Sequence, residues 1–216
     1  MSKPASMPAF PLNRLTPLAG VAFVPLLVVS QILEGNPPDI DGPTSTVVRF
    51  WTEHETQMRI SAILGAVALF FLVWFAGSLR AALRRAEGEV GTVSAIAFAG
   101  WVLFAVGGAM FDGFKLLAAD TAGDVPGAMT QTLFALQQDF FVPFALGFSL
   151  AFLASAAAIL RDRALPRWLG FAAVVIPFVL FTPAGFVAFI AGAVWILIVS
   201  VLLYLRGSSI AATEAR

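Results

Sequence analysis

Cysteine is absent from this chain of 216 residues, and histidine and tyrosine each occur only once. Without cysteine the protein has no disulfide bond, no thiol nucleophile and no thiolate metal site. His54 alone cannot supply a bis-histidine haem or a clustered histidine metal site, so we expect no metal and no cofactor. An excess of one charge sign is lacking too, because 13 Lys and Arg balance 13 Asp and Glu. The net charge therefore gives no indication of nucleic acid binding.

Apolar residues are what the chain has in abundance: 59% of its residues are hydrophobic, 12% are charged, and the mean hydropathy is +0.90. A membrane-spanning helix needs about 20 mostly apolar residues. The sequence therefore predicts an all-α polytopic membrane bundle in the lipid bilayer, forming one domain over residues 1–216. We expect six spans, near residues 16–34, 58–79, 93–117, 130–160, 167–182 and 185–205. A reversal near 181–185 separates the last two, although one long broken helix is an alternative interpretation.

The distribution of charge predicts an orientation, because Lys and Arg collect in short cytoplasmic segments. Most basic residues fall on the side that also holds both termini; the exceptions are Arg49, Arg59 and Lys115. Both termini are therefore expected in the cytoplasm, with the chain crossing a bacterial plasma membrane several times. Most acidic residues fall on the other side, so the outer half is expected to be acidic. The first apolar run lacks a small-residue cleavage site, so we expect it to be retained.

Charged residues close the third predicted span. An Asp or Lys at the bilayer centre costs roughly 2.5–3.5 kcal/mol, so such residues usually face a bundle interior, a cavity or a partner. Asp112 and Lys115 are three residues apart and share a helix face. Trp101 and Phe104 lie on or near the same stripe, which favours an aromatic wall that leads to an acid. The alternative interpretation is that both charged side chains reach out to the lipid headgroups.

An acid and a proline coincide in the fourth predicted span. Pro143 cannot donate a hydrogen bond to the carbonyl of Asp139, four residues earlier. Such freed carbonyls are tolerated where a helix lines a cavity or where neighbours satisfy them, and an ordinary kink below the surface is the alternative. We predict one polar pocket in the outward half of adjacent helices, shared by Asp112, Lys115, Gln138 and Asp139.

A further amphipathic helix is predicted before the second span. Ser45 can cap it, and apolar residues that include Trp51 recur at near-helical spacing. If this helix continued unbroken through the span it would be about 60 Å long, so it is expected to project outward or bend near Thr56. Its polar face carries Glu53, His54 and Glu55, which form either a solvated acidic surface or a lid with an acid over the bundle.

Several segments carry a family resemblance, at residues 18–23, 37–39, 79–88, 97–100, 165–170 and 195–200. On these segments the chain resembles a large group of small, six-span actinobacterial membrane proteins of mostly unassigned function. Residues 111–115 and 137–143 depart from the generic pattern of that group. This departure suggests a specialised site.

In size and style the chain also resembles bacterial integral membrane terpene cyclases that act on prenylated indole or cyclodipeptide substrates. That resemblance implies an isomerase or lyase that cyclises a lipophilic prenylated substrate by metal-independent protonation. The chemistry needs a buried, neutral carboxylic acid in a water-poor cavity, and aromatic faces that stabilise a carbocation. The expected proton donors are Asp139, Asp112 and Glu53. The expected substrate-binding residues are Trp51, His54, Trp101, Phe104, Phe111, Lys115, Gln138 and Phe140.

Two other functions fit the same residues. A proton- or cation-coupled transporter would bind its ion at Asp112 and Asp139, although the inner halves of the spans are expected to hold only Ser61, Ser94 and Ser155 and no carboxylate. A non-catalytic membrane scaffold or interaction subunit would instead keep its acids paired, without a cavity. A continuous polar path would favour the first, and a filled interior would favour the second.

Overall fold

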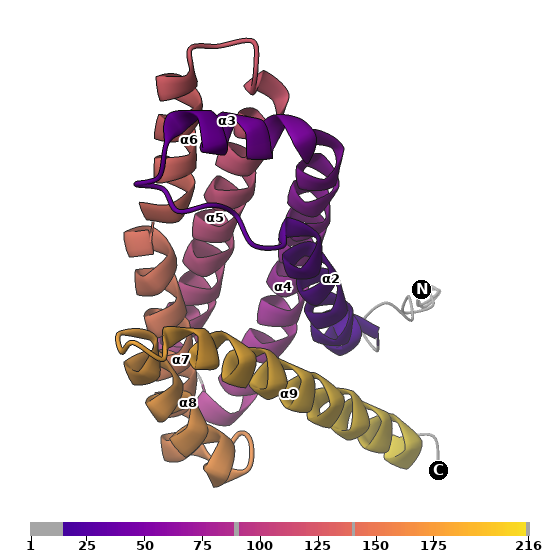
Figure 1. The fold of residues 1–216 in the computed structure, drawn as a ribbon. Helices are drawn as coiled ribbons and strands as arrows, with labels where there is room; N and C mark the ends of the chain where they lie inside the picture. The colour runs from indigo at the N-terminus through magenta and orange to yellow at the C-terminus, as the bar shows by residue number, and fades with distance from the viewer. Residues whose placement is uncertain (1–14, 89–90, 140, 215–216) are drawn as a thin grey trace, which may run out of the picture.

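The computed structural model describes residues 15–88, 91–139 and 141–214, without the side chains of residue 139 and residues 207–214. All regular structure in these residues is helical (Figure 1). The elements are η1 (Thr16–Leu18), α2 (Ala19–Glu34), α3 (Thr44–Glu53), α4 (Glu55–Glu87), α5 (Thr92–Thr121), α6 (Gly127–Asp139), α7 (Phe141–Asp162), α8 (Arg167–Leu180) and α9 (Gly185–Glu214).

Five stretches of the described chain are long and apolar enough to cross a membrane. They are Thr16–Glu34, Glu55–Glu87, Thr92–Thr121, Gly127–Asp162 and Gly185–Arg206. Each contains one of the predicted spans, because a run of about 20 apolar residues is a purely local signal. The expected all-helical fold with long apolar helices is confirmed at this level.

The predicted span at 167–182 is represented by α8, which has only 14 residues. Its length of about 21 Å is less than the roughly 30 Å of a hydrocarbon core. A turn after Leu180 sends the chain back along α9, so this region forms two helices and not one long broken helix. Phe181 beside this turn lies 6.4 Å from Phe141 at the start of α7, measured between ring centroids. The hairpin therefore turns at the level where α7 begins, and α6 extends beyond it.

The helix predicted before the second span is present as α3, which lies across the ends of the long helices (Figure 1). It breaks from α4 at His54, two residues before the expected bend at Thr56. The capping prediction is wrong: α3 begins at Thr44 after Pro43, and no side chain caps it. Its buried face packs on α6 and on the adjoining ends of α4 and α5, where Val47, Trp51, Met58, Ala118, Ala119, Leu133 and Phe134 form a small core. We call this end of the molecule the cap end.

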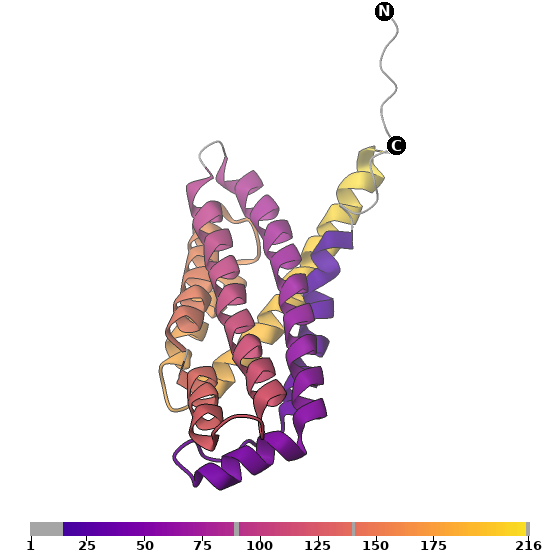
Figure 2. The same cartoon turned by 90° about the horizontal axis from the view of Figure 1, so that it is seen from above.

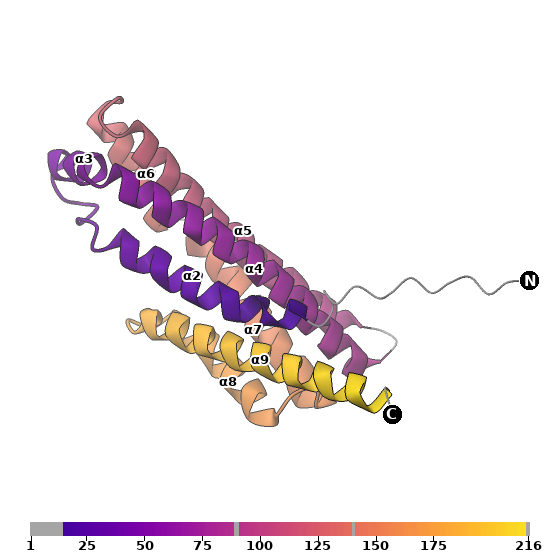
Figure 3. The same cartoon turned by 90° about the vertical axis from the view of Figure 1, so that its right-hand side faces the viewer.

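The opposite end of the bundle holds the start of α2 and the end of α9 (Figure 3). It also holds the ends of α4 and α7, so the arginine-rich segments of the sequence gather there. We call it the arginine end. Figure 2 shows α4 and α5 side by side along their length, while α9 crosses behind them at an angle.

The main core lies between the long helices, and small residues bring α5 and α7 close together. A Cβ atom at Gly100 would clash with the backbone of Ala151, and one at Gly147 would clash with the backbone of Phe104. Such close backbone approach is typical of membrane helix pairs. Between these contacts the aromatic rings of Trp101, Phe104, Phe148, Phe152 and Trp195 pack against one another.

Candidate functional site

Lys115 is the centre of a buried group of polar side chains near the cap end. Its side chain, on α5, is only 3% exposed. The Nζ atom donates to Glu34 Oε2 at 2.5 Å and to Ser61 Oγ at 3.2 Å, and it lies 3.5 Å from Asp112 Oδ1. One ammonium group thus connects α2, α4 and α5. Because an isolated buried charge is very costly, these partners are what permits Lys115 to be buried.

Two serines join α2 to α4 immediately beside this ammonium group. The Ser30 hydroxyl donates to the carbonyl oxygen of Ser61, and the Ser61 hydroxyl donates to the carbonyl oxygen of Ser30, both at 2.9 Å. Ser61 Oγ can therefore still accept from Lys115 with a lone pair. The arrangement is geometrically consistent, since each hydroxyl donates its single proton once.

The fourth helix is connected through an amide. Gln137 on α6 is 4% exposed, and its Nε2 atom donates to Glu34 Oε1 at 2.9 Å. Its Oε1 atom is buried and has no hydrogen-bond partner in the described residues. The polar cluster, as we define it, consists of Ser30, Glu34, Ser61, Asp112, Lys115 and Gln137.

Asp112 fits into the polar cluster because the helix facing it carries a glycine. A Cβ atom at Gly65 on α4 would clash with both carboxylate oxygens of Asp112. The Asp112 side chain is 14% exposed and that of Glu34 is 16% exposed. Two nearly buried carboxylates thus face a single ammonium group, and in their ionised forms the polar cluster carries a net charge of minus one.

The residues predicted for one polar pocket are distributed unevenly. Asp112 and Lys115 lie in the polar cluster, but Gln138 is exposed. Gln137 occupies the place expected of Gln138, since one residue along a helix turns the side chain by about 100°. The side chain of Asp139 and the whole of Phe140 lie outside the described residues.

The residues predicted on or near the amphipathic helix belong to the cap. Trp51 is buried against Phe134, with ring centroids 5.7 Å apart. His54 Nδ1 lies 2.9 Å from the carbonyl oxygen of Phe50, and its ring stacks on that of Phe50. Glu53 is exposed. Trp51 thus contributes to the cap core, and Glu53 faces outward without covering the bundle.

Of the aromatic residues predicted to line a pocket, Trp101 and Phe104 belong to the main core, and Phe111 is half-buried beside it. Trp101 is completely buried; its Nε1 donates to Ser155 Oγ at 3.3 Å, and its ring stacks on Trp195 at 6.1 Å. Phe104 lies 4.6 Å from Phe144, and Phe111 lies 5.4 Å from the same ring, between centroids. Neighbouring rings therefore occupy the space beside these side chains.

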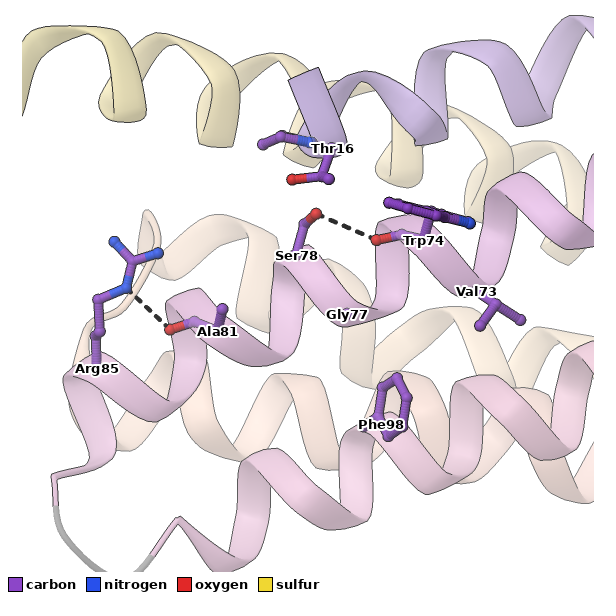
Figure 4. A pocket seen from close by; sticks show the side chains of 9 residues that line it. Thr16, Val73, Trp74, Gly77, Ser78, Ala81, Arg85 and Phe98 are labelled. Atoms are coloured by element: carbon purple, nitrogen blue, oxygen red, sulfur yellow. Dashed lines mark hydrogen bonds between the residues drawn. The ribbon is translucent and has the colours of Figure 1, made fainter. Parts of the chain in front are cut away.

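Two hollows lie at the arginine end, away from the polar cluster. One of about 560 Å³ is lined by Thr16, Pro17, Val73, Trp74, Gly77, Ser78, Ala81, Arg85 and Phe98 (Figure 4). Another of about 510 Å³ is lined by Arg80, Arg84, Gly91, Thr92, Ala95, Ile96 and Ala99. Neither contains a residue predicted for the site.

Sequence reasoning missed four members of the polar cluster: Ser30, Glu34, Ser61 and Gln137. Ser61 was expected in the inner half of its span. It lies in the second turn of α4, which begins at Glu55 at the cap end. The available signal was Glu34, an acid at the end of an apolar run, and Gln137, a polar residue in the fourth span. No group of three or more His, Cys, Asp or Glu side chains that could hold a metal ion occurs within the described ranges.

Comparison with known proteins adds no further information about the site. No family profile, curated protein or solved structure matches this chain.

Proposed function

We propose that the protein is a small cation-coupled membrane transporter and that the polar cluster is its cation site. The observation that supports this most is the charge of the cluster: Glu34 and Asp112 share the single ammonium of Lys115. A small cation, a proton being the smallest, would neutralise the remaining carboxylate charge. Ionisable groups inside a membrane bundle are costly and commonly mark ion pathways.

A second observation supports a ligand at the same place. Among the described residues, Gln137 Oε1 is buried without a donor, next to the amide nitrogen that holds Glu34. Leaving such an acceptor unsatisfied costs about 1–3 kcal/mol. A bound cation or a protonated ligand would supply what this oxygen lacks. Oxygen atoms from a carboxylate, a hydroxyl and an amide are also the ligands that hard monovalent cations accept.

The packing of the bundle suggests on which side the proposed ion path is closed. Leu72, Phe75 and Trp101 are completely buried between the polar cluster and the arginine end. This apolar layer would block ions, so we assign the structure to a state that is closed toward the arginine end. In the proposal the arginine end faces the cytoplasm of a bacterial plasma membrane, as the distribution of Lys and Arg predicts. The α8–α9 hairpin would then enter from the arginine end and return to it, so that the start of α2 and the end of α9 lie on the same side.

Flux measurements on the purified chain in liposomes test the proposal. We expect Na⁺, K⁺ or H⁺ to move several-fold faster than in empty liposomes, and Glu34→Gln and Asp112→Asn each to abolish the excess. Asp124→Asn is the matched control, because Asp124 is an exposed acid in the loop between α5 and α6. Wild-type flux equal to that of empty liposomes for all three cations would refute transport.

A scaffold or interaction subunit is the second candidate, and the filled core favours it. The acids of the polar cluster are paired, and the aromatic residues below them are packed. In this role the cluster would fix α2, α4, α5 and α6 in register beneath the cap. The two candidates differ in one measurable respect: a scaffold gives no flux above that of empty liposomes.

Acid-initiated cyclisation of a prenylated substrate stays a prediction, with less support from the geometry. Asp112 is held beside an ammonium group, and Trp101 and Phe104 are occupied in the core. Conversion of a prenylated indole by membranes that contain the protein, and its loss in Asp112→Asn, would revive this function.

A further inference from the structure

The first hollow at the arginine end combines an apolar floor with a charged rim. Val73 and Trp74 are exposed on α4, and Gly77 between them and the rim has open space where a Cβ would stand. Phe98 of α5 lies below (Figure 4). At the rim, Arg85 provides a guanidinium group, whereas the hydroxyl of Ser78 donates to the carbonyl oxygen of Trp74 at 3.1 Å.

The length of the hollow matches one leaflet of a bilayer. Val73 and Arg85 are twelve residues apart on one helix, which is about 18 Å along its axis. Half of a hydrocarbon core is about 15 Å. An acyl chain lying beside Trp74 and Gly77 would therefore bring its phosphate to the level of Arg85.

Arg80, Arg84 and Arg85 at the arginine end have no carboxylate partner among the described residues. Arg85 donates through Nε to the carbonyl oxygen of Ala81 at 3.1 Å, which leaves its two terminal nitrogens for a ligand (Figure 4). The guanidinium of Arg80 lies 5.2 Å from the centre of the Phe98 ring, at the edge of the hollow. Among the described residues, no carboxylate lies within 4.0 Å of a guanidinium nitrogen of Arg80, Arg84 or Arg85.

The described acids of the neighbourhood are already engaged. Glu87 accepts from the backbone N–H groups of Val93 and Ser94 at 2.7 and 2.9 Å, which caps the start of α5. Asp162 lies 3.2 Å from the Nε of Arg161. The positive charges of Arg80, Arg84 and Arg85 are therefore not paired with a described carboxylate, and an anionic ligand in the hollows could bind them. Basic pockets between membrane helices are suited to anionic lipid headgroups.

We propose that this hollow binds an anionic phospholipid of the surrounding leaflet, with its phosphate at Arg85 and an acyl chain over Gly77 against Trp74 and Phe98. Arg80 and Arg84, which line the adjoining hollow, raise the positive potential at the same rim. The occupant is a lipid and not a free anion, because most of the lining below the rim is apolar and open to the membrane.

Quenching of Trp74 fluorescence by brominated lipids tests the proposal on the full chain. The difference in quenching between wild type and Trp74→Phe isolates this tryptophan from the other four. Brominated phosphatidylglycerol is expected to reach half-maximal quenching at a mole fraction about fivefold lower than phosphatidylcholine with the same chains, as expected for about 1 kcal/mol from one arginine. Equal curves for the two lipids would overturn the proposal.

Variants separate the headgroup contact from the acyl-chain contact. Arg85→Gln is expected to remove most of the preference for phosphatidylglycerol, whereas Arg167→Gln, an exposed arginine at the start of α8, retains it. Gly77→Leu fills the hollow and lowers quenching by both lipids, whereas Gly113→Leu, at a second open position, does not. An unchanged preference in Arg85→Gln would overturn the proposal. Displacement of the lipid by millimolar inorganic phosphate would also overturn it, since the site would then be a general anion site.

Discussion

The two ends of the bundle treat their charged side chains in opposite ways. At the cap end, Lys115 is turned inward and meets Glu34, Asp112 and Ser61 within 3.5 Å. At the arginine end, Arg85 lies at the rim of a hollow, and among the described residues its guanidinium bonds to a carbonyl oxygen of its own helix. The cap end thus satisfies charge with other parts of the protein, and the arginine end leaves Arg85 without a carboxylate partner in the described part of the chain. The buried polar cluster fixes the relative positions of its helices, whereas the exposed arginine side chains can change their partners.

The largest expected effect comes from breaking the charge balance of the cap end. Lys115→Met leaves Glu34 and Asp112 buried without a counter-ion, and we expect a loss of about 3–5 kcal/mol in the free energy of unfolding. Denaturant titration of the purified protein in mixed micelles measures it. The triple variant with Glu34→Gln and Asp112→Asn added should recover most of the loss. A loss in the triple variant as large as in Lys115→Met would contradict the role of charge.

A pair of glycines on α4 extends the comparison to packing. Gly65→Ala places a methyl group against the carboxylate of Asp112, and we expect a cost of about 1–3 kcal/mol from overpacking. Gly77→Ala on the same helix enters open space, and replacing a helical glycine there should stabilise by up to about 1 kcal/mol. The same titration measures both variants. If both variants changed the free energy of unfolding in the same direction, the Asp112 side chain would be able to move away from the added methyl group at little cost.

The serine pair gives a smaller effect at the cap end. Ser30→Ala removes the donor to the carbonyl of Ser61, and we expect a cost of about 1 kcal/mol. Ser30→Ala combined with Ser61→Ala should be non-additive, because the two hydroxyl groups bond reciprocally between the same two helices. Strict additivity in this cycle would show that the pair does not act as a unit.

The smallest effect is expected at the arginine end. Arg85→Gln in detergent without added phospholipid should change the free energy of unfolding by less than about 0.5 kcal/mol, because the side chain is exposed. Thermal unfolding followed by circular dichroism is sufficient to measure this. A large loss in detergent would mean that Arg85 is a structural residue, and the comparison between the two ends would fail.

Much of the fold was predictable because the relevant signals are local. Runs of apolar residues predicted the long helices, and the unlikely length of a continuous helix from Ser45 to Arg85 predicted the break that occurs at His54. The length of α8 was harder to assess. The predicted span extended to residue 182, but α8 ends at Leu180 and the turn has already begun at Phe181.

The candidate site was only partly predictable, because its contacts connect distant segments. Asp112 and Lys115 were evident as charges near lipid, three residues apart. Glu34 lies 81 residues from Lys115 along the chain, and no local pattern pairs them. The choice between Gln137 and Gln138 depends on the phase of a helix whose neighbours are unknown from sequence. Trp101 and Phe104 carry the same sequence signal whether they line a cavity or fill a core.

The hairpin between α8 and α9 satisfies several of its own polar groups. Thr182 donates its hydroxyl to the carbonyl of Val179 at 2.7 Å and accepts from the N–H of Ala184 at 3.2 Å. The backbone N–H of Gly185 in turn reaches the carbonyl of Thr182 at 2.9 Å. A chain reversal surrounded by hydrocarbon must satisfy its own amide groups. Because Thr182 takes part in three of these hydrogen bonds, it lowers the cost of a short chain reversal wherever water is scarce.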